Sequence, residues 1–138
     1  MPVENTTGRP SSPRVRVDTA TPADRVPILS IFDAAMLETD SDALAARIEA
    51  GTVLVARTTD GERRLGALAR EGTEIVAIAV RPRRRGQGIG TLLVETALAR
   101  CDRVTATFDR GVRPFWESVG FTVSPIGETG RFRGYHPA

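Results

Sequence analysis

The chain has 138 residues and an apolar fraction of 41%, enough for one soluble domain with a buried core. It contains no run of eighteen apolar residues and no apolar segment after a basic start, so we expect neither a membrane-spanning helix nor a secretory signal. Its single cysteine, Cys101, excludes an internal disulfide and fits the reducing cytoplasm, where we expect the protein to work.

The positive charge is concentrated in one short segment. The chain has nineteen arginines, no lysine and seventeen acidic residues, for a formal net charge of +2. Arg81, Arg83, Arg84 and Arg85 supply four of the arginines, which leaves 15 basic against 17 acidic residues elsewhere. A nucleic-acid binder usually spreads its charge along a face, so the sequence favours a local anion site. The lack of lysine excludes Schiff-base chemistry and a lysine-containing phosphate loop.

The N-terminal third is predicted to contain a leader, a strand and two helices. Residues 1–13 are rich in Pro, Ser, Thr, Asn and Gly and predict a disordered leader. Arg14–Val17 alternates polar and apolar residues, as a strand does. Thr21 is the expected N-cap of the first helix, and Asp24, three positions on, would complete a capping box with it. Ser41 is expected to cap the second helix, and Gly51 to stop it. The first helix has apolar residues at helical spacing: Ile28, Ile31, Phe32, Ala35 and Met36.

Six further strands and two helices follow. The strand Thr73–Val80 is nearly all apolar, as expected for a central strand that is covered on both faces. The order of elements predicts a mixed sheet with helices on both faces. The other predicted elements are the strands Thr52–Thr58, Arg64–Arg70, Arg103–Phe108, Phe121–Ser124 and Arg131–Tyr135, and the helices Gly88–Arg100 and Val112–Val119.

A glycine-rich loop joins the strand ending at Val80 to the helix starting near Gly88. Free N–H groups at a helix start attract an anion, and glycines let a phosphate approach without meeting a Cβ. The loop lacks the spacing of a dinucleotide fingerprint, because Thr91 occupies the third glycine's place counted from Gly86. Arg85 adds a guanidinium that can form charge-assisted hydrogen bonds. The sequence therefore predicts a polyanion site.

The segment Arg85-Gly86-Gln87-Gly88-Ile89-Gly90 matches the pattern R-x-x-G-x-G and resembles the acetyl-CoA pyrophosphate loop of the GNAT superfamily of N-acetyltransferases. The preceding "EIVAIAV" is similar to the family's strand before that loop, and "RPFWESVGF" is similar to its downstream aromatic signature. The resemblance covers roughly Val15 to Tyr135. It implies an α/β (α+β) fold, with a mostly antiparallel sheet of about seven strands flanked by about four helices and a splayed fourth and fifth strand.

The resemblance also implies a site for acetyl-CoA as co-substrate, with no metal. The pantetheine arm would lie between the splayed strands, the pyrophosphate on the glycine-rich loop, and the thioester carbonyl near a main-chain N–H at Val80. Where the family has an asparagine, this chain has Asp109, which changes a usual contact to the cofactor arm. The implied cofactor residues are Ile78, Ala79, Val80, Arg85, Gly86, Gln87, Gly88, Ile89, Gly90, Thr91, Asp109 and Phe115.

The catalytic candidates implied by the resemblance are Glu74, Trp116 and Tyr135. Glu74 precedes the apolar strand and would act through water as the general base, with Glu71 as the fallback; the alternative is an exposed strand residue. Trp116 stands where many members have a proton-donating tyrosine, and an indole cannot release a proton at neutral pH. Tyr135, the only tyrosine, could replace that acid. We expect Phe115 to be buried and Trp116 to line the cofactor gap.

The acceptor amine is expected beside the turn between the first two helices. Phe32, Glu38 and Asp40 are the candidate substrate-binding residues, because the family's acceptor site borders this turn. The carboxylates there, with Asp42, would attract a cationic amine or would simply cap a helix and fill a polar loop. His136, near the chain end, is expected to be inert.

The leading interpretation is an N-acetyltransferase that moves an acetyl group from acetyl-CoA to a primary amine by direct attack in a ternary complex. The alternative is a non-catalytic, GNAT-like acyl-CoA-binding or sensor module. A nucleic-acid binder ranks last, because it leaves the glycines and "FWESVGF" unexplained. No membrane partner is expected, the acceptor is a small molecule or a protein, and a homodimer is left open.

Overall fold

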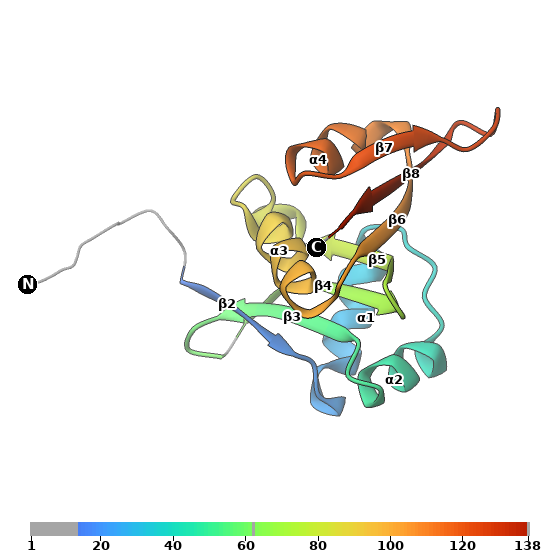
Figure 1. Cartoon of the computed structure of the whole chain (residues 1–138). Helices are drawn as coiled ribbons and strands as arrows, with labels where there is room; N and C mark the ends of the chain where they lie inside the picture. Colours follow the sequence, from blue (N-terminus) through green and yellow to red (C-terminus); the bar gives the residue numbers. More distant parts are fainter. Residues whose placement is uncertain (1–13, 62, 138) are drawn as a thin grey trace, which may run out of the picture.

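The computed structural model describes residues 14–61 and 63–137, so the leader predicted for residues 1–13 lies outside the described residues. One seven-stranded sheet forms the centre of the molecule (Figure 1). Three single turns of 3₁₀ helix connect its elements: Pro22–Asp24, Pro82–Arg84 and Arg110–Val112. The helices are α1 (Arg25–Ala34), α2 (Ser41–Glu49), α3 (Ile89–Arg100) and α4 (Arg113–Ser118). The strands are β2 (Val15–Thr19), β3 (Val53–Thr58), β4 (Arg64–Glu71), β5 (Glu74–Val80), β6 (Val104–Asp109), β7 (Thr122–Pro125) and β8 (Arg131–His136).

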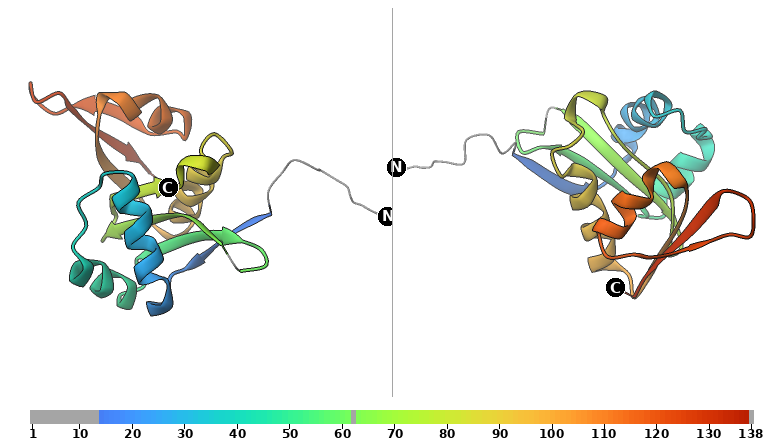
Figure 2. Two further views of the ribbon diagram at one scale, coloured as in Figure 1. Left: turned by 180° about the vertical axis from the view of Figure 1, so that it is seen from behind. Right: turned by 90° about the horizontal axis from the view of Figure 1, so that it is seen from above.

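The strands follow the spatial order β2-β3-β4-β5-β6-β8-β7, and only β5 and β6 run parallel. Helices α1 and α2 cover one face of the sheet, and α3 and α4 cover the other (Figure 2). A crossover connection is what parallel strands require, and α3 supplies it between β5 and β6. The predicted mixed, mostly antiparallel sheet with helices on both faces is confirmed. No helix among the described residues is long and apolar enough to cross a membrane.

Two apolar clusters fill the spaces between the helices and the sheet. The cluster under α1 and α2 includes Ile28, Phe32 and Leu44, all without exposed surface. The cluster under α3 and α4 contains Leu93 and a group of stacked aromatic rings around Trp116. Successive strand residues alternate between the faces, so β3, β4 and β5 contribute to both clusters. For that reason β3 and β4 are buried on both faces along most of their length, whereas β5 is only partly covered.

The parallel strands β5 and β6 separate soon after they begin. They pair only at Glu74 with Thr105 and at Ile75 with Ala106. On its other edge β5 stays paired with β4 as far as Val80, but the register shifts after Ile75, which makes Val76 an extra residue in a β-bulge. The splayed pair implied by the family resemblance is therefore present. It opens towards the C-terminal ends of both strands.

The ends of α1 and α2 differ from the prediction. The chain enters α1 through a 3₁₀ turn after Thr21, and α2 is capped by Asp40, whose side chain accepts the Ala43 N–H at 3.2 Å. Met36 was expected on the buried face of the first helix, yet it lies beyond the helix end with φ of 61° and 90% exposure. A left-handed conformation costs a residue with a Cβ roughly 1–2 kcal/mol, which makes Met36 a strained position.

Hydrogen bonds explain the turn at Met36. The Met36 N–H donates to the Asp33 carbonyl at 2.9 Å, and the Leu37 N–H donates to the Phe32 carbonyl at 3.0 Å. This is the pair of bonds that ends a helix in a Schellman motif, in which glycine usually takes the left-handed position. Methionine stands there in this chain. The helical pattern of apolar residues therefore stops one residue earlier than predicted.

His136, expected to be inert near the chain end, belongs to β8 and packs against Phe121, with ring centroids 5.4 Å apart. Its Nδ1 atom is buried and has no hydrogen-bond partner among the described residues. The last strand thus extends to the edge of the aromatic group and closes that end of the core.

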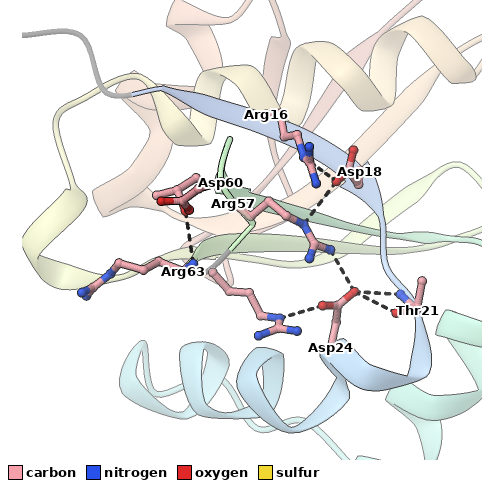
Figure 3. Close-up of polar contacts among 9 residues, drawn as sticks. Arg16, Asp18, Thr21, Asp24, Arg57, Asp60 and Arg63 are labelled. Atoms are coloured by element: carbon pink, nitrogen blue, oxygen red, sulfur yellow. Dashed lines mark hydrogen bonds and ion pairs between the residues drawn. The ribbon is translucent and has the colours of Figure 1, made fainter.

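A buried carboxylate joins α1 to the sheet. Asp24 is 1% exposed, and one of its oxygens meets Arg57 at 3.0 Å (Figure 3). Its other oxygen meets Arg64 at 2.6 Å. Asp24 also accepts the Thr21 N–H at 2.8 Å, which closes the predicted capping box. Burial by itself raises the pKa of the Asp24 carboxyl, but its bond from Thr21 and its two arginine partners outweigh burial and hold the pKa below its ordinary value of 3.8.

We expect Asp24→Asn to lower the free energy of unfolding at pH 7 by about 3–5 kcal/mol, because it breaks a buried ion pair on one side only. Asp18→Asn is the matched control: its carboxylate is 40% exposed and also pairs with Arg57, at 3.2 Å. That change should cost under about 1 kcal/mol. Urea denaturation measures both, and equal losses would contradict the assignment.

The same measurement has a pH dependence. Since the pKa of Asp24 is lower in the folded than in the unfolded protein, its contribution is complete above its ordinary value of 3.8 and is lost as the pH falls through the folded value. The difference in unfolding free energy between wild type and Asp24→Asn should therefore stay constant at neutral pH and shrink in acid. A difference that grows in acid would contradict the depressed pKa.

Candidate active site

A cavity of about 700 Å³ fills the opening between β5 and β6. The two splayed strands form its walls, Phe115 and Trp116 close it on the α4 side, and Ala35 and Leu37 reach it from the α1–α2 connection. Its lining is mostly apolar, and the charged lining residues are Arg85, Asp109 and Arg131. Small-molecule sites commonly combine an apolar wall with a few placed polar groups.

The open edge of β5 presents backbone groups to this cavity. The Arg81 N–H donates to the Leu65 carbonyl at 2.8 Å, and this bond flanks the pair formed by Gly66 and Val80. In an antiparallel ladder, hydrogen-bonded and non-hydrogen-bonded pairs alternate. Val80 and Ile78 therefore occupy non-hydrogen-bonded positions towards β4, and their N–H and C=O groups point into the gap towards β6. An extended ligand with amide groups could pair there as a strand would.

The glycine-rich loop forms a second, smaller cavity of about 240 Å³ at the start of α3. Gly86 and Gly88 have φ of 76° and 83°, and a Cβ built on either would meet nothing within 4 Å. The space beside both glycines is therefore open to a ligand. Arg85 donates from Nε to the Val80 carbonyl at 3.1 Å, which holds the arginine across the loop and uses only one of its guanidinium nitrogens. The dipole of α3 and the positive charge of Arg85 together favour an anion at this loop.

The two cavities form one continuous site, because four residues line both of them: Val80, Arg85, Gly90 and Phe115. The predicted cofactor residues gather along it, and all of them except Gln87 line one cavity or the other. Gln87 instead accepts a hydrogen bond from Arg84 at 3.0 Å. The geometry thus joins a polyanion site to a narrow apolar gap with a backbone edge.

The aromatic pair is arranged differently from the prediction. Phe115, expected to be buried, is half-buried and lines both cavities, where it lies against Gly90. Trp116 does line the gap, but it is only 3% exposed. Its ring stacks on Phe108 at a centroid distance of 5.4 Å and meets the edge of Phe121 at 4.9 Å. The indole therefore packs mainly against the aromatic rings of the core, and only a small part of it borders the cavity.

The catalytic candidates Glu74 and Tyr135 lie outside the lining of both cavities. Glu74 is exposed at the closed end of the splay, and its register partner Thr105 is in turn the partner of Tyr135 on β8. Register partners share a face, so these side chains lie on the face away from α3 and α4, with Glu74 and Tyr135 two strands or roughly 10 Å apart. The fallback Glu71 forms an ion pair with Arg47 at 2.8 Å.

The residues predicted for the acceptor side are not in the lining either. Phe32 has no exposed surface, because it packs in the core beneath α1. Asp40 is the N-cap of α2, and Glu38 is exposed outside the cavity. The same connection instead reaches the cavity through Ala35 and Leu37.

Sequence reasoning missed several lining residues, among them Arg131 and Val112. Arg131 pairs with Asp109 at 3.0 Å because the register of β6 and β8 sets the two residues opposite each other. Val112 lines the cavity from the turn before α4 and is 47% exposed. A register between two strands that are far apart in the sequence and an irregular turn leave no local signal.

The sequence matches the family model described as an acetyltransferase (GNAT) domain over residues 23–136. Among solved structures, Rv2747 from Mycobacterium tuberculosis, in complex with CoA, is 20% identical with a TM-score of 0.75, and the match covers 89% of this chain and 99% of that one. Naa50 from Arabidopsis thaliana, in complex with a bisubstrate analogue, is 17% identical with a TM-score of 0.72, covering 88% and 97%. A GNAT-family acetyltransferase from Bacillus cereus is 17% identical with a TM-score of 0.74, covering 88% and 94%. A search of the curated proteins finds no significant match.

We expect Gly88→Ala to weaken acetyl-CoA binding at least tenfold, or about 1.4 kcal/mol, because its Cβ would enter the open space beside the loop. Gly72→Ala is the matched control: Gly72 also has a positive φ, of 60°, and open space around it, but lies in the turn between β4 and β5. Both changes should cost similar stability, roughly 1–2 kcal/mol. Calorimetric titration should separate them, and unchanged affinity in folded Gly88→Ala would exclude the loop as the phosphate site.

Proposed function

The chain belongs to the GNAT acetyltransferase family, whose domain model covers residues 23–136, and from that membership we propose that it transfers an acetyl group from acetyl-CoA to a primary amine. The observation that carries the proposal is the continuity of the glycine-rich loop with the gap between β5 and β6. A pyrophosphate on the loop and a thioester in the gap would use one connected site. The amine would attack the thioester directly in a ternary complex.

The cofactor would extend along β5. Its pyrophosphate would accept the N–H groups of residues 86–91 and a charge-assisted bond from Arg85. Its pantetheine amides would pair with the open edge at Val80, next to the loop, which supplies hydrogen bonds that β6 does not. The Ile78 N–H, farther along the arm, would then stabilise the oxyanion formed from the thioester carbonyl, in place of the Val80 N–H expected from the resemblance. Phe115, shared by both cavities, would pack beside the arm.

The amine must lose a proton before it can attack. An alkylamine with a pKa of ~10.4 is neutral about once in 2,500 molecules at pH 7, an apparent barrier of roughly 4.6 kcal/mol. We assign Glu74 as the base, because it is an exposed carboxylate on the face away from α3 and α4. Since Glu74 does not line the cavity, the proton would reach it through water.

The leaving group would depart as a thiolate. The amine nitrogen forms a bond to the acetyl carbon, the C–S bond breaks, and the sulfur keeps the electron pair. The nitrogen, cationic after the attack, loses its second proton to water as the amide forms. A thiol of pKa ~8.5 leaves without a proton donor, and Trp116 cannot supply one. Tyr135 is 43% exposed but outside the lining, so the mechanism assigns it no proton transfer.

A second candidate function is a module that binds acyl-CoA without turnover. It is favoured by one observation: the lining of the main cavity holds no histidine, tyrosine or glutamate, and its one carboxylate, Asp109, is paired with Arg131. Both functions require acetyl-CoA binding. Only the enzyme releases free CoA when an amine is added, so a thiol assay with an amine panel decides between them.

We expect Glu74→Gln to lower kcat at neutral pH while acetyl-CoA affinity stays within twofold, because the carboxylate acts on the amine alone. The deficit should shrink as the pH rises and the amine arrives neutral. Glu71→Gln is the control, since Glu71 lies opposite Glu74 in the same hairpin and is already paired with Arg47. A pH–rate profile identical to wild type in Glu74→Gln would remove this residue from the mechanism.

A further inference from the structure

Exposed apolar side chains gather around the mouth of the cavity. The large hydrophobic residues that are most exposed in the described chain are Val26, Met36, Val76, Val112 and Tyr135. Two of them, Val76 and Val112, line the cavity itself, and Met36 stands between the lining residues Ala35 and Leu37. Scattered exposed hydrophobics need no explanation, but a group around one cavity marks a binding surface.

These three residues come from separate parts of the chain. Met36 lies in the α1–α2 connection, Val76 in the bulge of β5 and Val112 in the turn after β6. The bulge gives β5 one residue more than its partner strand needs, at the point where β6 departs. Bulges often redirect a side chain beside an active site, and Val76 is left 42% exposed.

Met36 adds an argument from strain. Its backbone is left-handed, in a position that glycine fills without strain, and its side chain is 90% exposed. A methionine here neither relaxes the turn nor packs in the core. Strained residues are kept where the surrounding structure uses them, which is often at a ligand site. An apolar ligand group is what such a flexible, apolar side chain would contact.

The charges at the cavity disfavour acceptors with additional charge. Arg85 lies at the loop end, and Asp109 and Arg131 neutralise each other at 3.0 Å. A second ammonium group, as in a polyamine, would find Asp109 already paired. A carboxylate, as in an amino acid, would approach Arg131 but would be repelled by the neighbouring carboxylate of Asp109. Asp40, on the α1–α2 connection, serves as a helix cap.

Building on the proposed function, we propose that the acceptor is an amine attached to an apolar group, and that Met36, Val76 and Val112 form the surface that selects it. Two sources share this chemistry: a free arylalkylamine or alkylamine, and the α-amine of a peptide whose first side chain is large and apolar. The amine would enter the gap, and its apolar substituent would rest on these three residues.

The test compares acceptors by the release of free CoA from acetyl-CoA. The panel is phenethylamine, a tripeptide amide beginning with methionine, the same tripeptide beginning with aspartate, spermidine and glutamate. We expect kcat/KM for phenethylamine or the methionine peptide to exceed that for spermidine and glutamate at least tenfold. The two apolar arms separate a small-molecule source from a peptide source, and the aspartate peptide controls for peptide length.

Variants test the surface itself. Met36→Asn places a residue that tolerates the left-handed turn but removes the apolar side chain. Val112→Ser removes the apolar side chain in the turn before α4. Each should raise KM for the preferred apolar amine at least fivefold, with kcat and acetyl-CoA affinity unchanged. Val26→Ser is the matched control, because Val26 is 66% exposed on α1 and does not line the cavity. It should leave both constants unchanged.

The outcomes separate the two proposals. Acetyl-CoA binding with no CoA release for any amine would overturn the proposed function and the apolar acceptor with it. CoA release with spermidine or glutamate as the best acceptor would keep the function and overturn the apolar surface. So would an unchanged KM for the apolar amine in both Met36→Asn and Val112→Ser.

Discussion

The site depends on one constraint: β5 stays paired with β4 along its length, while β6 leaves it after two residue pairs. An unpaired strand edge inside a sheet is costly, because its backbone groups must find partners. Here the edge at Ile78 and Val80 borders a cavity instead of a strand. The fold thus leaves an unpaired backbone edge beside the cavity, and this edge is where the proposed cofactor arm would bind.

Different interactions stabilise the two sides of the gap between β5 and β6. On the β8 side, the rings of Phe108, Trp116, Phe121 and Phe132 pack face to face and edge to face behind β6. On the other side, the carboxylate of Asp24 ties the start of α1 to β3 and β4 through two arginines. Close packing of the rings holds the first half, and removal of one partner from the buried ion pair is costly in the second. The gap lies between these two halves, with a mostly apolar lining.

The spacing of residues along the sequence predicted features formed by neighbouring residues, but it did not predict contacts between residues far apart in the sequence. The glycines and Arg85 could be placed because a loop and the helix after it are contiguous in the sequence. Asp24 was recognised only as a helix cap, because its arginine partners lie 33 and 40 residues away. Trp116 lines the gap as predicted, but Phe115 lines it too instead of being buried, since two adjacent aromatics do not reveal how a six-residue helix is rotated. The splay followed from the family resemblance, whereas Arg131 required the register of β6 and β8.

The buried indole at the wall of the gap has an optical consequence. Trp116 is the only tryptophan of the chain, so the protein's indole emission arises from one place, which is 3% exposed and borders the cavity. Its spectrum in the folded protein should resemble that of an indole in an apolar solvent. Occupancy of the gap changes the surroundings of that single ring, and unfolding transfers it to water. The chain therefore carries a built-in fluorophore that distinguishes a filled site from an empty one without any label.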